Sequence, residues 1–138
     1  MNQKDLVNQM DAVVAIAALT INSDTTTASA AIDMQGAEGA LILMHSGVIA
    51  GGDGANVYTP LITECETSGG SYTAVADADL INTEASAVLD GNTEGVKKIG
   101  YIGKMRYIKV SIVATAFTTA GGIVGAIVLR GVNDKPAA

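Results

Sequence analysis

The chain has 138 residues, a formal net charge of −6, 49% hydrophobic residues, no tryptophan and one cysteine. This length is typical of one domain that buries a core without metals or disulfides. The single cysteine excludes an intramolecular disulfide framework, and the negative charge argues against a general affinity for polyanions. The opening MNQKDLVNQMD lacks a secretory signal pattern.

Charged residues are segregated along the chain. No lysine or arginine lies between Lys4 and Lys97, and thirteen of the fourteen acidic residues fall in that interval. From Gly95 to Asn133 there are six basic residues and no acid. A fold that places the two segments side by side balances these charges, whereas a fold that separates them gives one acidic and one basic face.

The first half of the chain reads as short apolar strands separated by turn residues. Segment 1–11 is predicted to be a helix or an arm, because Leu6, Val7 and Met10 have near-helical spacing. The strands predicted after it are Ala12–Ile21, Ala28–Met34, Ala40–His45 and Val57–Glu66. The turn Thr67–Ser71 then has the length of a hairpin connection.

The second half continues this pattern. Its predicted strands are Tyr72–Val75, Val96–Ile102, Arg106–Phe117 and Ile123–Val132. Segment 82–92 is ambiguous, and Thr83–Leu89 fits one helical turn or a loop. About eight strands at this spacing indicate an all-β sandwich over residues 12–132, with an arm at 1–11 and a tail at 133–138.

One segment is long and apolar enough to suggest a membrane span. Val110–Leu129 contains twenty uncharged residues between Lys109 and Arg130. However, Ile108–Thr115 alternates with period two, and Thr118–Gly122 has the composition of a turn. The sequence therefore favours a β-hairpin over a membrane helix.

The residues that could form a catalytic site are sparse. His45 and Cys65 are the only histidine and cysteine, and no spacing suggests an orienting third group or an oxyanion hole. Glu64 and Glu66 flank Cys65 and oppose thiolate formation. No catalytic residue is predicted. Nothing in the sequence singles out, among the fourteen acidic residues, a pair of carboxylates that could catalyse glycoside hydrolysis.

Two loop patterns resemble ligand sites only in part. Gly51–Gly54 lacks the Lys-Ser/Thr end of a phosphate-binding loop and is interpreted as a turn. Asp77-Ala78-Asp79 and Asp90-Gly91-Asn92 could attract a hard cation, but neither provides the ligand run of an EF-hand. No cofactor or metal site is predicted.

The stretch KKIGYIGKMRYIK, Lys97–Lys109, contains five of the eight basic residues and two tyrosines. A short connection at Gly103-Lys104 suggests that its two halves form neighbouring strands, with their charges on one face or at one end. Three interpretations of these charges follow, given from the most to the least favoured. They are a solvated face paired with acidic strands, a docking surface for an acidic partner, and a nucleic-acid groove.

Several phrases together resemble a family. These are TTTASAAIDMQGAEGALILMHSG, YTP, SYTAVADADL and KKIGYIGKMRYIKVSIV. They are similar to the jelly-roll capsid decoration, or cement, proteins of tailed bacteriophages, most closely to those of Bordetella-type podophages, over about Ala12–Val132. One departure is Thr67–Tyr72, where relatives often have an aspartate-rich turn followed by an aromatic residue.

The resemblance implies a jelly-roll-like antiparallel sandwich on the outer surface of a virion. Such a protein would bind the assembled capsid, cement neighbouring major capsid subunits and form a homo-oligomer, with a dimer favoured over a trimer. It would be neither an enzyme nor a binder of nucleic acid or membrane. The candidate partner contacts are Leu6, Val7 and Met10 on the arm, and Lys97, Lys98, Lys104, Arg106 and Lys109 as a basic patch.

Two other classes of function stay open at this point. Jelly rolls also serve as carbohydrate- or host-surface-binding modules, although the absence of tryptophan and the five aromatic residues count against stacking on sugars. An enzyme that uses acidic residues on a β-scaffold is the other alternative. Activity towards candidate substrates would support it.

Overall fold

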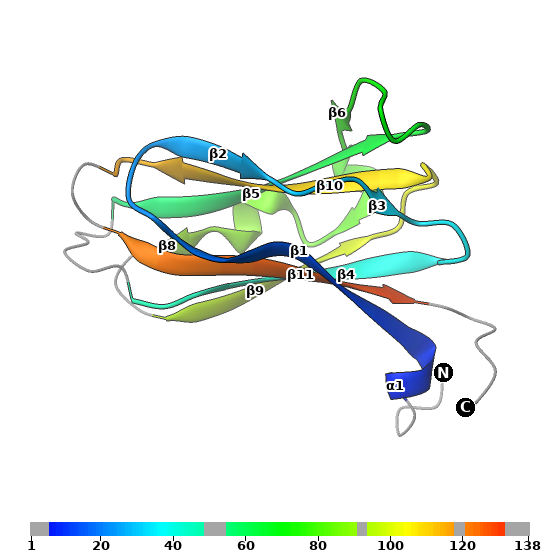
Figure 1. Ribbon diagram of the computed structural model, residues 1–138, viewed down its shortest axis with the longest axis horizontal. Coiled ribbons are helices and arrows are strands. Elements are labelled where there is room, and N and C mark those ends of the chain that lie inside the picture. Colours follow the sequence, from blue (N-terminus) through cyan, green and yellow to red (C-terminus); the bar gives the residue numbers. More distant parts are fainter. Residues whose placement is uncertain (1–5, 49–54, 91–93, 118–120, 132–138) are drawn as a thin grey trace.

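The computed structural model describes residues 6–48, 55–90, 94–117 and 121–131 (Figure 1). Within these ranges the chain forms eleven strands in two antiparallel sheets. The two sheets lie face to face in Figure 1 and enclose the core between them. The prediction of an all-β, jelly-roll-like sandwich is confirmed. The strand count exceeds eight because four of the strands have only two residues.

Sheet A has five strands in the order β1-β11-β4-β9-β7. Their bounds are β1 Met10–Ile21, β11 Gly122–Gly131, β4 Gly39–Ser46, β9 Gly95–Tyr101 and β7 Leu80–Ile81. Sheet B has the order β2-β10-β5-β6, with β3 beside β10 and β8 beside β5. Its bounds are β2 Thr25–Ala28, β3 Ile32–Asp33, β5 Val57–Cys65, β6 Thr73–Ala74, β8 Leu89–Asp90 and β10 Tyr107–Thr115.

The remaining elements of the described chain are short helices. The α-helix α1 covers Leu6–Gln9, and the 3-10 helices η2 and η3 cover Asp77–Asp79 and Glu84–Ala87. The helical alternative for the ambiguous segment 82–92 is therefore correct for one turn. No helix in the described ranges is long and apolar enough to cross a membrane.

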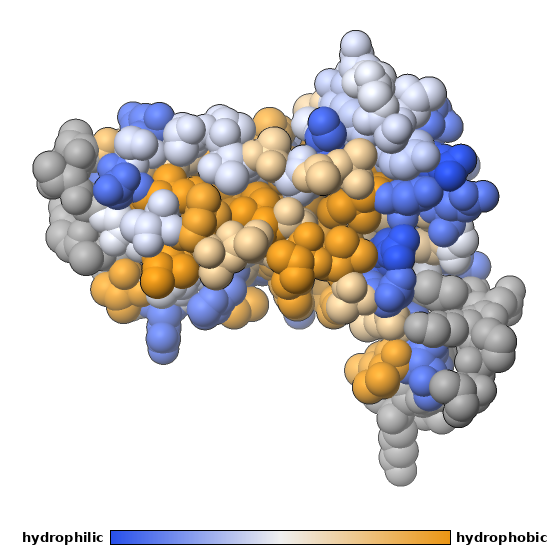
Figure 2. All heavy atoms as spheres, viewed as in Figure 1, coloured by the Kyte–Doolittle hydropathy of each residue, from blue (hydrophilic) through white to orange (hydrophobic). Residues whose placement is uncertain are grey.

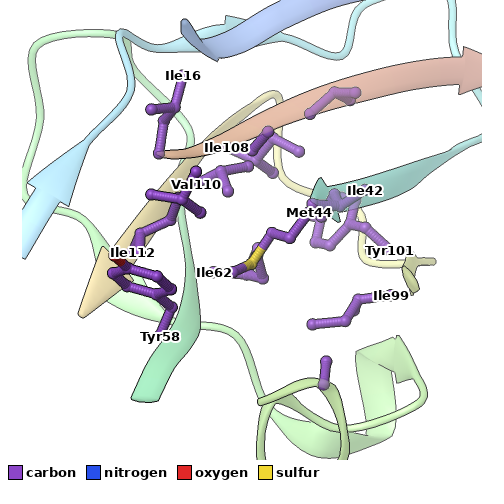
Figure 3. Close-up of a cluster of buried hydrophobic side chains, with 14 of the residues drawn as sticks. Ile16, Ile42, Met44, Tyr58, Ile62, Ile99, Tyr101, Ile108, Val110 and Ile112 are labelled. Carbon is purple, nitrogen blue, oxygen red and sulfur yellow. The ribbon is translucent and has the colours of Figure 1, made fainter. Parts of the chain in front are cut away.

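Alternation of apolar side chains explains the core. In β10, Ile108, Val110 and Ile112 are fully buried between the sheets, as the period-two pattern predicts. In β4 and β11, every second residue points inward in the same way and is buried. Figure 3 shows side chains of β4 and β9, from sheet A, meeting those of β5 and β10, from sheet B. Each fully buried Ile or Val contributes about 1.5–3 kcal/mol relative to exposure.

Two buried tyrosines join the sheets by hydrogen bonds. Tyr58 on β5 donates to the carbonyl of Ile21 at 2.7 Å and accepts from the amide of Gly122 at 3.1 Å. Tyr101 on β9 donates to Glu64 Oε2 on β5 at 2.7 Å. Both rings are almost completely buried, so each hydroxyl needs the partner it has.

Two predicted strand pairings are wrong. Strands β9 and β10 lie in different sheets, although their short connection suggested neighbouring strands. Strands β10 and β11 also lie in different sheets, so 110–129 contains two strands but no hairpin. The physical reason is that β9, β10 and β11 each bury one apolar side. A strand that crosses to the facing sheet buries this side as completely as a strand that pairs with its sequence neighbour in the same sheet.

Most other predicted boundaries agree closely or shift slightly. The predicted strand Ala28–Met34 is divided, since the structure has β2 at Thr25–Ala28 and β3 at Ile32–Asp33. The hairpin around Thr67–Ser71 is confirmed, since Thr63 pairs with Ala74 and Glu64 with Thr73. Strand β1 begins at Met10, inside the predicted arm, because Met10 pairs with Gly131. The glycine-rich loop 51–54, the centre of the 118–122 turn, the 91–92 part of the acidic turn and the tail 133–138 lie outside the described residues.

Candidate docking surfaces

The two residues that could form a nucleophile–base pair are far apart in the fold. His45 lies on β4 of sheet A and Cys65 at the end of β5 of sheet B. Among the described residues there is no group of three or more His, Cys, Asp or Glu side chains that could hold a metal ion. His45 and Cys65 lie in different sheets and therefore do not form a nucleophile–base pair.

The outward side of sheet A is apolar. Alternation places Leu41 and Leu43 opposite the buried Ile42 and Met44, and the same rule turns Ile123 and Ile127 of β11 outward. The members of this surface, called the apolar face below, are Val14, Leu41, Leu43, Val96, Ile123, Ile127 and Leu129. The exposed fractions of Val14, Val96 and Ile123 are 66%, 60% and 58%.

Several of these side chains form a row across four strands. Val14 pairs with Ile127, Ile127 with Leu43, and Leu43 with Lys98. Directly opposite residues of antiparallel strands share one side of the sheet, so the row is continuous from β1 to β9. Figure 2 views the molecule from the edge where β1 lies rather than onto this side of sheet A, and it shows hydrophobic residues across the middle with hydrophilic residues towards both ends.

A groove of 640 Å³ opens on the apolar face. Its walls come from β1, β11, β4 and β9, and it reaches the core residues Ile16, Val124 and Ala126. The cause is an irregular β1, whose register with β11 shifts between Val14 and Ile16 and again between Ile16 and Leu19. The ladder is interrupted there, as expected at β-bulges.

Gly125 allows this irregular segment to approach β11. A Cβ atom at Gly125 would lie 3.2 Å from the Ile16 carbonyl oxygen and 3.3 Å from Ala18 Cα. Both contacts are tighter than ordinary van der Waals distance, and both are to backbone atoms. The glycine therefore sets the depth of the groove.

The predicted basic patch is divided by the fold. Lys97 and Lys98 lie on β9 of sheet A, whereas Arg106 and Lys109 belong to the β10 region of sheet B. Lys104 lies between them, where it lines a hollow of 470 Å³ with Met34, Glu38 and Arg106. Because adjacent residues of a strand point to opposite sides, only Lys98 shares the apolar face, while Lys97 shares the side of Ile99.

The two cations of sheet B are engaged with neighbours. Arg106 donates to both carboxylate oxygens of Asp33, at 3.1 and 3.0 Å, and its guanidinium lies 5.1 Å from the centre of the Tyr107 ring. Hydrogen bonds from Arg106 and then from the Gln35 amide hold the pKa of Asp33 below its usual value. Lys109 Nζ lies 4.4 Å from the Tyr72 ring centre.

The candidate contacts on the arm divide differently. Leu6 and Val7 lie on α1 with exposed fractions of 40% and 86%, and α1 has no buried residue. Met10 is half-buried and belongs to sheet A through its pairing with Gly131. Leu6 and Val7 are therefore available to a partner, whereas Met10 has a structural role in β1.

Few aromatic rings of the described chain are available for stacking on sugars. Tyr58, Tyr101 and Phe117 are buried in the core. Tyr72 and Tyr107 lie on the outward side of sheet B, where a lysine and an arginine occupy positions over their rings. Among the described residues, no aromatic ring lies on the apolar face.

Sequence reasoning did not single out the apolar face. The signal was present in ALILMH and IVGAIVL, where apolar residues occupy both alternating positions of a strand. Such runs are typical of strands buried on both sides. Here only the sheet arrangement reveals that Val14, Val96, Ile123 and Ile127 are exposed together, beside the half-buried Leu41, Leu43 and Leu129.

Comparisons with known proteins give a likeness of fold. No family model and no curated protein sequence matches this chain. A solved structure of the CBM22-1–GH10 modules of xylanase 10B from Clostridium thermocellum, complexed with xylohexaose, is similar with a TM-score of 0.52 and 11% identity. The match covers 95% of this chain and 28% of that one, so the chain spans less than a third of the solved protein.

A second solved structure is more distant. A family two carbohydrate esterase from Cellvibrio japonicus has a TM-score of 0.37 and 7% identity, over 88% of this chain and 33% of that one. At these identities the first likeness concerns the fold alone. It agrees with the β-sandwich described above and assigns no function to this chain.

Proposed function

We propose that this protein is a structural component of a phage virion that binds the outside of an assembled capsid and cements neighbouring major capsid subunits. The single observation that carries the proposal is the apolar face of sheet A. Large aliphatic side chains exposed together on one sheet are typical of a protein–protein contact. The family resemblance of the sequence names the partner.

The energetics of such a face suit a protein whose role is adhesion. Each aliphatic side chain that becomes fully buried at a contact contributes about 1.5–3 kcal/mol. A protein that binds the closed shell better than free subunits stabilises the shell by that difference in affinity. We also propose that the protein forms a homo-oligomer, because each oligomer would then make several contacts with the capsid.

A carbohydrate- or host-surface-binding module is the second candidate. The likeness of fold to a chain that contains a carbohydrate-binding module favours it. The chemistry of the surface favours it less, because Tyr72 and Tyr107 are each covered by a cation. Glycan binding by the purified protein, lost on replacing these tyrosines, would favour this candidate over the capsid.

The test of the proposal has two steps. Mass spectrometry of purified mature particles from the source of this chain should find the protein in copy number comparable to the major capsid protein. Particles stripped of it should then rebind the purified protein and withstand higher temperature before releasing DNA. A few copies per particle would point to the tail or a vertex, and complete absence would refute a virion role.

A further inference from the structure

We infer that the groove between β1 and β11 is the anchor point for the coat subunit, and that it receives a loop or strand with aliphatic side chains and a carboxylate facing Lys98. This inference rests on the proposed function and specifies the surface and the chemistry of the partner. It replaces the predicted five-residue basic patch by one lysine at the border of an apolar groove.

The shape and lining of the groove select aliphatic groups. Val14, Ile123 and Ile127 form exposed walls, and the floor reaches the core at Ile16 and Val124. A side chain inserted there would extend the core of the sandwich through the irregular part of β1. The volume of 640 Å³ admits several aliphatic side chains of a folded segment.

Charge selects the rest of the partner. The outward residues of the strands of sheet A include one charged side chain, Lys98, and the titratable His45. Among the described residues that line the groove there is no acidic side chain. The whole chain has a net charge of −6, so most of its surface does not favour a partner carboxylate. On the apolar face, a partner carboxylate would instead meet Lys98 and no acidic side chain of the strands of sheet A. Among the described residues, Lys98 forms no salt bridge of its own.

The observations favour a coat subunit over a second copy of this chain as the occupant. In a symmetric pairing of two such faces, each Lys98 would meet an apolar surface without an acid, so its charge would be buried without a partner. A coat segment with a carboxylate satisfies both the apolar groove and the lysine. Opposite charges at the border of an interface mainly set orientation and association rate.

Rebinding of purified protein to stripped particles tests the groove. Ile127→Asp should weaken rebinding about thirtyfold or more, since it places a carboxylate in the apolar contact. Val113→Asp, an equivalent change on the outward side of sheet B, should rebind like the wild type. Circular dichroism melting of both variants separates lost binding from lost folding.

A matched pair of charge reversals tests the lysine. Lys98→Glu should reduce rebinding about tenfold at low salt, and the loss should shrink as salt rises. Lys97→Glu makes the same change in net charge one residue away, on the other side of β9, and should have little effect. Carbodiimide cross-linking, followed by peptide mapping, should join Lys98 to an aspartate or glutamate of the coat subunit.

The outcomes separate the inference from the proposed function. If wild-type protein rebinds and Ile127→Asp rebinds equally well, the groove is not the anchor, while the capsid role stands. If Ile127→Asp instead converts an oligomer in solution to a monomer, a second copy occupies the groove and the inference is wrong. If wild-type protein does not rebind at all, the proposed function fails first.

Discussion

At the scale of single residues, hydroxyl groups hold the two sheets in place. Tyr101 reaches from β9 to Glu64 on β5, and it also accepts the Met105 amide at 3.2 Å. Burial, followed by the hydrogen bond to Glu64, raises the pKa of the Tyr101 phenol above its ordinary value. The same atoms that join the sheets therefore couple stability to alkaline pH.

Replacing Tyr101 by phenylalanine should destabilise the fold by about 1–3 kcal/mol, because Glu64 and the Met105 amide lose a buried partner. The substitution should also reduce the fall of the unfolding free energy at alkaline pH. In the unfolded chain tyrosine loses its proton near pH 10, whereas the folded protein keeps it to higher pH, so the wild-type free energy of unfolding falls as pH rises above about 10. Urea unfolding between pH 8 and 11 measures both effects.

Tyr107→Phe is the matched control, since that ring lies half-buried on the outward side of sheet B. It should change the unfolding free energy less than Tyr101→Phe does. Some alkaline sensitivity should persist in Tyr101→Phe, because burial also raises the pKa of Tyr58. An unchanged alkaline slope in Tyr101→Phe would contradict this account of the hydroxyl.

At the scale of elements, β1 determines the character of the docking surface. A regular twelve-residue strand would pair throughout with β11 and close the groove, but its two register shifts keep the groove open. Those shifts depend on Gly125, whose missing side chain admits the backbone of Ile16 and Ala18. A single glycine on one strand thus shapes its neighbour.

Gly125→Val should lower the free energy of unfolding by about 1–3 kcal/mol, since the added side chain meets backbone atoms that cannot rotate away. The same variant should reduce rebinding to stripped particles, because the groove changes shape. Gly47→Ala is the control at the same groove, where a Cβ would meet nothing within 4 Å. Thermal melting that shows equal stability for both variants would rule out the proposed role of Gly125.

At the scale of the whole molecule, the fold brings the acidic first half of the chain against the basic second half. Arg130 on β11 pairs with Asp11 on β1, and Arg106 pairs with Asp33 on β3 at 3.0 Å. Both acids come from the interval without lysine or arginine. Of the two arrangements that the charge pattern allowed, these two contacts realise the balanced one in part. Lys98 on the apolar face is among the lysines of the described chain that form no salt bridge.

Removal of residues 1–9 should leave the sandwich folded, with a change in unfolding free energy of less than about 0.5 kcal/mol, because α1 has no buried residue. A deletion through residue 11 should cost more, since it removes the Met10–Gly131 pairing and the Asp11–Arg130 ion pair. Chemical denaturation of the two truncations measures the difference. Reduced rebinding of the shorter truncation would assign Leu6 and Val7 to the capsid contact.

The sequence by itself determined the class of fold and the places of the longer strands. The alternation in Ile108–Thr115 and the turn at Thr67–Ser71 could be predicted because strand pleating and hairpin turns depend on residues that are close together in the chain. Only the tertiary structure decided which strands pair, because any strand with one apolar side can be buried in either sheet. That choice separated Lys98 from Arg106 and left Val14, Ile123 and Ile127 exposed together, since sheet membership depends on contacts between residues far apart in the chain.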